Sequence, residues 1–182
     1  MGKIKMKHID ISVIILNFNT RGLTDTCIER LKQSVLGEYH MEIILCDNAS
    51  IDGTVEQIRK KYPDVIVIQN KGNLGFAAGN NPGIRRAKGR YVVLLNSDTE
   101  VSTTAIAQMI AFMDLHPRAG AATCKLVLPD GRMDPACHRD FRRHGHHSHI
   151  WSSLRNYFQI QNYSVIIIRD IRICLLFMKL TV

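Results

Sequence analysis

Short apolar runs recur along the first hundred positions of the chain, and each run stops at a polar cluster. The four runs cover residues 11–16, 42–46, 65–68 and 91–95. Continuous apolar runs of this length are typical of buried parallel strands. The clusters that follow them are rich in Asn, Asp and Gly, which favour turns. The pattern therefore predicts four strands with polar residues at their carboxyl ends.

Helical spacing of apolar residues lies between these predicted strands. The first helix has Leu23, Cys27, Ile28, Leu31 and Val35 on one face, the second has Val55 and Ile58, and the third has Ile106, Met109, Ile110 and Met113. Ser50 or Asp52 is expected to cap the second helix, and Ser102 to begin the third. Strands that alternate with helices predict an α/β fold with a mostly parallel sheet flanked by helices. The four polar clusters would then share one edge of the sheet.

Asp98 follows the last of these strands, in the stretch 91–100. Ligands of open α/β sheets bind at the carboxyl ends of the strands. A carboxylate there can hold a hard divalent cation, because Mg²⁺ and Mn²⁺ prefer oxygen ligands. The alternative is that Asp98 only caps the following helix. Local spacing does not separate the two interpretations.

A glycine-rich segment covers residues 72–81 and leads into a predicted helix that runs to about Ala87. It is neither G-x-G-x-x-G nor a phosphate loop with G-K-[ST], so the two common nucleotide fingerprints are excluded. A glycine-rich helix entry still lets a ligand approach the backbone, and a helix N-terminus favours anions. An ordinary strand-to-helix turn would explain the same residues.

Charge and cysteine content indicate which partners and which cellular compartment to expect. The net charge is +8, but residues 1–140 carry only +3 and residues 141–182 carry +5. The basic balance therefore comes largely from the end of the chain, and no nucleic-acid partner is expected, since no basic stripe interleaved with aromatic residues is present. Five cysteines without paired spacing indicate reduced intracellular thiols, and Cys46 is expected in the core. The six-residue apolar run near the N-terminus is too short for a signal peptide, so a cytoplasmic location is expected.

Four segments together resemble a known family. They are Asn17-Phe18-Asn19, the stretch 47–54 from Asp47 to Thr54, the stretch 73–81 from Asn73 to Asn81, and 95–99 around Asp98. In this order and spacing they resemble the N-terminal half of family 2 glycosyltransferases, which are inverting enzymes of GT-A fold. The rhamnosyltransferase-like enzymes of bacterial cell-surface polysaccharide synthesis are the most similar subgroup. The resemblance implies a Rossmann-like nucleotide-binding half over residues 1–141.

The resemblance implies a site for a dTDP- or UDP-sugar. Asp47 would accept a hydrogen bond from N3–H of the base, and Asn17 and Asn19 would line the base and ribose pocket. Asp52 would cap the second helix near the nucleotide. The remaining residues implied to contact the nucleotide sugar are Asn48, Asn73, Gly75, Asn80 and Asn96.

Asp98 matches the last carboxylate of the D-x-D metal motif of that family, whereas Asn96 stands in place of its first Asp. One carboxylate fewer implies a weaker Mg²⁺ or Mn²⁺ site, in which diphosphate oxygens complete the coordination shell. The metal would act as a Lewis acid on the leaving diphosphate.

No match to the catalytic base of the family is present after the metal motif. Its acidic pair stands well past the metal motif, and Asp130, Asp134 and Asp140 match no such motif. The resemblance implies that the full enzyme transfers a sugar to a glycan or a lipid-linked saccharide at the inner face of the plasma membrane. This chain, which lacks a recognisable base, is expected to be inactive. Two alternatives stay open: a nucleotide-binding module without turnover, and a nucleotidyltransferase. The latter would carry a basic glycine-rich loop directly after the first strand.

Residues 142–182 are unlike the family. They contain a histidine cluster at 144–149 and an apolar stretch interrupted by charges. The cluster lacks carboxylate or cysteine partners at metal-ligand spacing, and the charges make a membrane span unfavourable. Permitted codons for 141–145, read one base out of phase, can encode the Phe-Pro-Thr-Pro segment that is usual in the family. We therefore hypothesise that the residues from about 142 onward are translated out of frame. Resequencing the gene would test this hypothesis.

Overall fold

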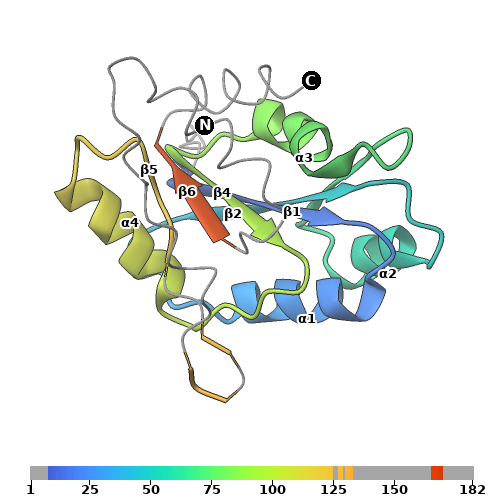
Figure 1. The fold of residues 1–182 in the computed structure, drawn as a ribbon, viewed down its shortest axis with the longest axis horizontal. Coiled ribbons are helices and arrows are strands. Elements are labelled where there is room, and N and C mark those ends of the chain that lie inside the picture. Colours follow the sequence, from blue (N-terminus) through green and yellow to red (C-terminus); the bar gives the residue numbers. More distant parts are fainter. Residues whose placement is uncertain (1–7, 125–126, 129, 133–164, 170–182) are drawn as a thin grey trace, which may run out of the picture.

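The computed structural model describes residues 8–124, 127–128, 130–132 and 165–169, and Figure 1 shows their arrangement. Six strands form one sheet in the order β3-β2-β1-β4-β6-β5. The strands are β1 (Ile11–Asn17), β2 (Met41–Asp47), β3 (Ile66–Gln69), β4 (Tyr91–Asn96), β5 (Ala121–Ala122) and β6 (Val165–Ile168). The helices are α1 (Arg21–Lys32), α2 (Thr54–Lys61), α3 (Gly75–Arg86) and α4 (Ala105–Leu115).

The four predicted strands pair in parallel. β1 lies between β2 and β4, and β3 pairs with the outer side of β2. This confirms the prediction of a mostly parallel sheet. Two further strands make the sheet mixed, because β6 runs antiparallel to β4 and β5 runs antiparallel to β6. β6 lies within the stretch that the sequence analysis separates from the family, and the boundary at 141 stays a prediction.

Helices cover both faces of the sheet (Figure 1). Alternate residues of β1 divide the core: Val13 and Ile15 pack with α1, α2 and α4, whereas Ile14 packs on the other face with α3. Because strand side chains alternate between faces, a strand buried on both sides reads as a continuous apolar run. That burial explains the runs seen in the sequence.

The helix boundaries differ from the predicted ones. Leu23 is 51% exposed and Val35, beyond the end of α1, is 63% exposed, so neither belongs to the buried face of α1. Gly53, with a φ of 79°, occupies the N-cap position of α2, but the carboxylate of Asp52 accepts from the N–H of Thr54 and so caps the helix from one residue further back. Thr104, rather than Ser102, is the N-cap of α4. A glycine at positive φ costs little, which lets α2 begin directly at Thr54.

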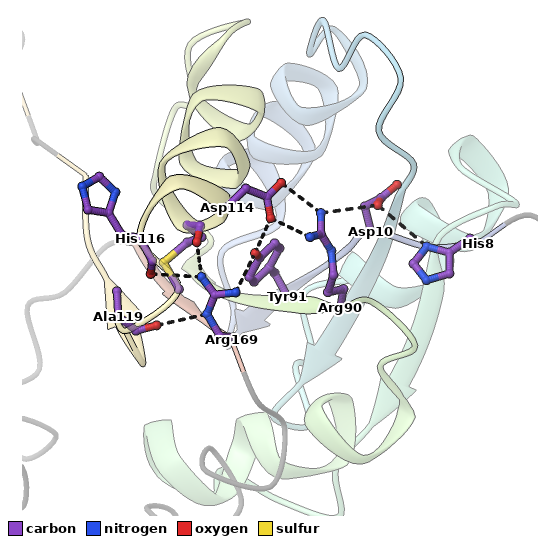
Figure 2. A network of polar contacts seen from close by, with 9 residues as sticks. His8, Asp10, Arg90, Tyr91, Asp114, His116, Ala119 and Arg169 are labelled. Atoms are coloured by element: carbon purple, nitrogen blue, oxygen red, sulfur yellow. Dashed lines mark hydrogen bonds and ion pairs between the residues drawn. The ribbon is translucent and has the colours of Figure 1, made fainter.

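A polar network closes the edge of the sheet at which the parallel strands begin (Figure 2). The Tyr91 hydroxyl donates to Asp114 on α4 (2.6 Å) and accepts from Arg169, which follows β6 (3.2 Å). Arg169 also donates to the carbonyls of His116 and Ala119. The network therefore joins β4, β6 and the end of α4. It lies at the opposite edge of the sheet from the one at which the parallel strands end. Within the described residues, no helix has the length and apolar character needed to span a membrane.

Candidate functional site

The carboxyl ends of β1, β2, β3 and β4 meet at one edge of the sheet (Figure 1). Asn17 stands opposite Asp47, and Asp47 stands opposite Gln69. On the other side of β1, Leu16 stands opposite Asn96. Parallel pairing therefore gathers the polar clusters that are far apart in the sequence, as the sequence analysis predicts.

Asn17 is the centre of this edge. Its Nδ2 donates to Oδ1 of Asp47 (2.7 Å) and to Oγ of Ser50 (2.9 Å). Its Oδ1 accepts from the hydroxyls of Thr20 (2.6 Å) and Thr24 (2.7 Å). Asn17 is fully buried. Since an amide has two N–H donors and one carbonyl oxygen, its side chain is saturated by the protein and holds Asp47 rather than facing an open pocket.

Asp47 is also fully buried. Its Oδ1 accepts from Asn17, and its Oδ2 accepts from the backbone N–H of Ser50 (2.9 Å). A carboxylate offers about four lone-pair positions, so each oxygen keeps one free. These free lone-pair positions are enclosed by the protein in this structure, since the residue is fully buried.

Asn19 fastens the loop after β1 to the loop after β2. Its backbone has a φ of 53°, in the left-handed region that Asn tolerates. Its N–H donates to Ser50 Oγ (2.9 Å), and its Oδ1 accepts from the N–H of Ile51 (2.9 Å). The side chain stays exposed, and Ile51 is 93% exposed beside it.

Asp52 serves two helices at once. Its Oδ2 accepts from the backbone N–H of Arg21, the first residue of α1 (2.9 Å). Its Oδ1 accepts from the N–H (3.1 Å) and hydroxyl (2.5 Å) of Thr54, the first residue of α2. Burial raises the pKa of Asp52, but the hydrogen bonds from Thr54 and Arg21 outweigh that effect and hold the pKa below its usual range. Asp52 thus joins the starts of α1 and α2.

Asn48 and Asn70 join the second and third strand ends. Asn70 Nδ2 donates to Asn48 Oδ1 (2.8 Å), and Asn48 Nδ2 donates to Asn73 Oδ1 (3.2 Å) and to the carbonyl of Gly75 (3.3 Å). Asn48 is almost fully buried, whereas Asn73 and Gly75 are exposed. Gly75 has a φ of 71°, which explains a glycine at the start of α3.

The first turns of α3 lie close against the ends of β1 and β2. A Cβ on Gly79 would lie 2.7 Å from Leu16 Cδ1 and 2.8 Å from Asn48 Oδ1, so any larger residue would force one of these side chains to move. Asn80 is fully buried and donates to the carbonyl of Phe76 (2.8 Å). In the part of the chain that the structure describes, Oδ1 of Asn80 and Oδ1 of Asn81 are buried without a hydrogen-bond partner. Such an atom is costly unless a water or ligand satisfies it.

Asp98 lies in a turn at the end of β4. The N–H of Thr99 donates to the carbonyl of Asn96 (3.2 Å) and closes the turn. Ser97 is buried at 8% exposure, and Asp98 is exposed. Cys27 of α1 lies beside this turn, with its Sγ 3.9 Å from the Asn96 carbonyl. Burial, and then the charge of Asp98, raises the pKa of the Cys27 thiol to about 12 and keeps the thiol neutral. No three His, Cys, Asp or Glu side chains of the described residues gather into a metal site, so Asp98 alone would need ligand oxygens to complete a coordination shell.

Four further residues organise this edge: Thr20, Ser50, Asn70 and Ser97. Sequence reasoning considered Ser50 only as a helix cap and gave the other three no role. All four stand in the polar clusters, but their hydroxyl and amide groups carry no charge and match no catalytic pattern. Their only signal is a position within three residues after the end of a strand. The structure shows that they connect the predicted residues to one another.

Comparisons with known proteins agree with this architecture. The family model for Glycosyl transferase family 2 matches residues 12–170. UDP-Glc:alpha-D-GlcNAc-diphosphoundecaprenol beta-1,3-glucosyltransferase WfaP of Escherichia coli is 36% identical over 106 residues, which are 57% of this chain and 41% of that protein. Poly(ribitol-phosphate) beta-glucosyltransferase of Bacillus spizizenii is 31% identical over 106 residues, covering 56% of this chain and 17% of that protein. This chain spans less than half the length of either relative.

Solved structures show the same fold. S. aureus TarS 1-349 has a TM-score of 0.66 and 20% identity, with 88% of this chain and 47% of that chain covered. Mannosyltransferase PcManGT from Pyrobaculum calidifontis, in complex with GDP-Man and Mn²⁺, has a TM-score of 0.62 and 19% identity, with 90% and 45% covered. These likenesses confirm the GT-A fold, and the family match continues past the predicted boundary at 141. The chain therefore belongs to glycosyl transferase family 2.

Proposed function

We propose that this chain binds a dTDP- or UDP-sugar at the edge where β1, β2, β3 and β4 end. It would form the donor-binding half of an inverting glycosyltransferase of cell-surface polysaccharide synthesis. The observation that carries the proposal is the convergence of Asn17, Asp47, Asn48 and the Asp98 turn on that edge. TarS has been solved with UDP and with UDP-GlcNAc, which supports a uridine nucleotide. The rhamnosyltransferase-like subgroup stays a prediction.

The residues of the edge divide into two roles in this proposal. Asn17 is saturated by hydrogen bonds within the protein, and Asp52 accepts three such bonds, so both act by holding the loops. Asp47 keeps free lone pairs for the N3–H of the base, while the exposed Asn19, Asn73 and Gly75 lie where a ribose and diphosphate can approach. The unpartnered Oδ1 of Asn80 would accept from a ligand hydroxyl or a water.

Asp98 is the residue that would hold Mg²⁺ or Mn²⁺, with diphosphate oxygens as the other ligands. A bound cation would act as a Lewis acid on the leaving diphosphate. Asp98 fits this role because it is exposed at the rim, while the nearby Asp47 is buried and hydrogen-bonded. Asn96 presents an amide, so a single carboxylate faces the ligand and the metal affinity should depend on the nucleotide.

A calorimetric titration tests the proposal. UDP, dTDP and ADP are added to the purified chain with and without Mn²⁺. We expect UDP and dTDP to bind, more tightly with Mn²⁺, and ADP to bind more weakly because its base offers no equivalent of N3–H. Asp98→Ala should remove the metal dependence and keep part of the metal-free binding.

Glu100→Ala is the matched control. Glu100 is also exposed, two residues further on, and pairs with Arg30 at 3.4 Å. Its removal changes the local charge by the same amount but takes away no proposed ligand. Equal affinity for ADP and UDP, or equal effects of the two substitutions, would contradict the proposal.

A further inference from the structure

A chain of hydrogen bonds runs across the ends of three strands, from Ser97 after β4 to Asp47 at the end of β2. Ser97 Oγ lies 2.8 Å from Thr20 Oγ1. Thr20 Oγ1 lies 2.6 Å from Asn17 Oδ1, and Asn17 Nδ2 lies 2.7 Å from Asp47 Oδ1. Asp47, Asn17 and Ser97 are all buried, so water competes little for these bonds.

The bonds share one direction. A hydroxyl has a single hydrogen, and the one on Thr20 is directed at the carbonyl oxygen of Asn17. The hydrogen between Ser97 and Thr20 must therefore come from Ser97. Asn17 in turn donates to Asp47, so each group donates toward the carboxylate. Aligned bonds of this kind polarise one another, and the last bond is strengthened by the negative charge that it meets.

Ser97 also determines where Asp98 stands. The turn closed by Thr99 N–H and the Asn96 carbonyl has Ser97 at its buried side and Asp98 at its exposed side. The bond from Ser97 to Thr20 thus fastens the turn to the start of α1. The turn also contacts α1 through Cys27 Sγ, 3.9 Å from the Asn96 carbonyl, and Glu100 directly after the turn pairs with Arg30 at 3.4 Å. The bond from Ser97 is shorter than either contact and is the one made at the start of α1.

We propose that Ser97 and Thr20 are positioning residues that hold Asp98 in register with Asp47, so that one hydrogen-bond chain sets both the metal end and the base end of the donor site. This inference rests on the proposed donor-binding function. It assigns to the middle residue of the Asn-Ser-Asp sequence at 96–98 a role distinct from that of the metal ligand beside it.

The test separates metal affinity from nucleotide affinity. The apparent Mn²⁺ affinity is measured at saturating UDP, and the UDP affinity is measured without metal. Ser97→Ala should weaken the apparent Mn²⁺ affinity about fivefold, the effect of one neutral hydrogen bond, and leave metal-free UDP binding within about twofold. Thr20→Val should weaken both, because Thr20 bonds to Ser97 on one side and to Asn17, which holds Asp47, on the other. Thr20→Ser, which keeps Oγ1, should restore both.

Thr26→Val is the control. Thr26 Oγ1 donates to the carbonyl of Gly22 on the exposed side of α1 (3.1 Å), so its loss removes a hydroxyl of the same kind outside the chain of bonds. An unchanged Mn²⁺ affinity in Ser97→Ala, or equal losses of both affinities, would overturn the inference alone. Weaker Mn²⁺ or UDP binding in Thr20→Ser would show that the methyl group of Thr20 matters and not its hydroxyl. That result would also overturn the inference. Failure of the unsubstituted chain to bind UDP or dTDP would overturn the proposed function and this inference together.

Discussion

Replacing Asp52 with Ala removes one carboxylate from the starts of two helices. The backbone N–H of Arg21 at 2.9 Å and that of Thr54 at 3.1 Å both lose their acceptor. A lost cap costs about 1 kcal/mol of stability, so two cost about 2 kcal/mol. The Thr54 hydroxyl is fully buried and loses its acceptor as well, which adds about 1 kcal/mol. We expect the free energy of unfolding to fall by about 2–3 kcal/mol.

The dependence on pH gives this prediction a second readout. The pKa of Asp52 is held below its usual range in the folded protein. A lowered pKa contributes stability that is fully present above the unfolded-state pKa of about 3.9 and is lost as the pH falls through the folded-state value. Urea unfolding should therefore show the same penalty for Asp52→Ala at pH 7 and pH 5, and a smaller one at pH 3.

Two further variants define the mechanism. Asp52→Asn keeps an acceptor for Thr54 but has no second oxygen for Arg21, so it should cost about half as much as Asp52→Ala at pH 7. Asp64→Ala removes an exposed carboxylate paired with Lys32 and should cost about 0.5 kcal/mol or less. A cost for Asp52→Ala no larger than that for Asp64→Ala, or one that does not change between pH 5 and pH 3, would refute the bridging cap.

Three other predictions follow from the packing and the sequence. Gly83→Val should lower the free energy of unfolding by about 1–3 kcal/mol in urea, since a Cβ there would lie 2.6 Å from Cys46 Sγ. Gly22→Ala should leave the free energy of unfolding unchanged, because the space around Gly22 is open. Tyr91→Phe should cost about 1–2 kcal/mol in the same assay, because the hydroxyl joins Asp114 to Arg169. The 182-residue chain should bind a nucleotide sugar without transferring it to saccharide or lipid-linked acceptors, with slow donor hydrolysis as the control reaction; robust transfer would identify a base among the acids that match no family motif.

The sequence by itself determined the parallel core of the sheet and the edge at which the polar strand ends gather. Buried strands need apolar side chains on both faces, so β1, β2, β3 and β4 are visible as continuous runs, and parallel pairing requires their polar ends to meet. The apolar spacing also located α1, α2 and α4, and the glycine-rich segment located α3. Helix starts were less certain, because Gly53 and Thr104 act as caps through backbone conformation, which composition does not reveal.

Only the tertiary structure decided which polar residues at the strand ends are buried and hydrogen-bonded and which are exposed. Asn17 and Asp98 are similar in sequence, since each follows an apolar run, yet Asn17 is buried and saturated while Asp98 is exposed at the rim. Much of that difference arises from neighbours far away in the chain: Asp47 and Ser50 accept from Asn17, and the buried Ser97 beside Asp98 bonds to Thr20. The antiparallel β6 likewise depends on pairing with β4. Hydrogen bonds between distant residues leave no periodic pattern, so spacing along the chain cannot show them.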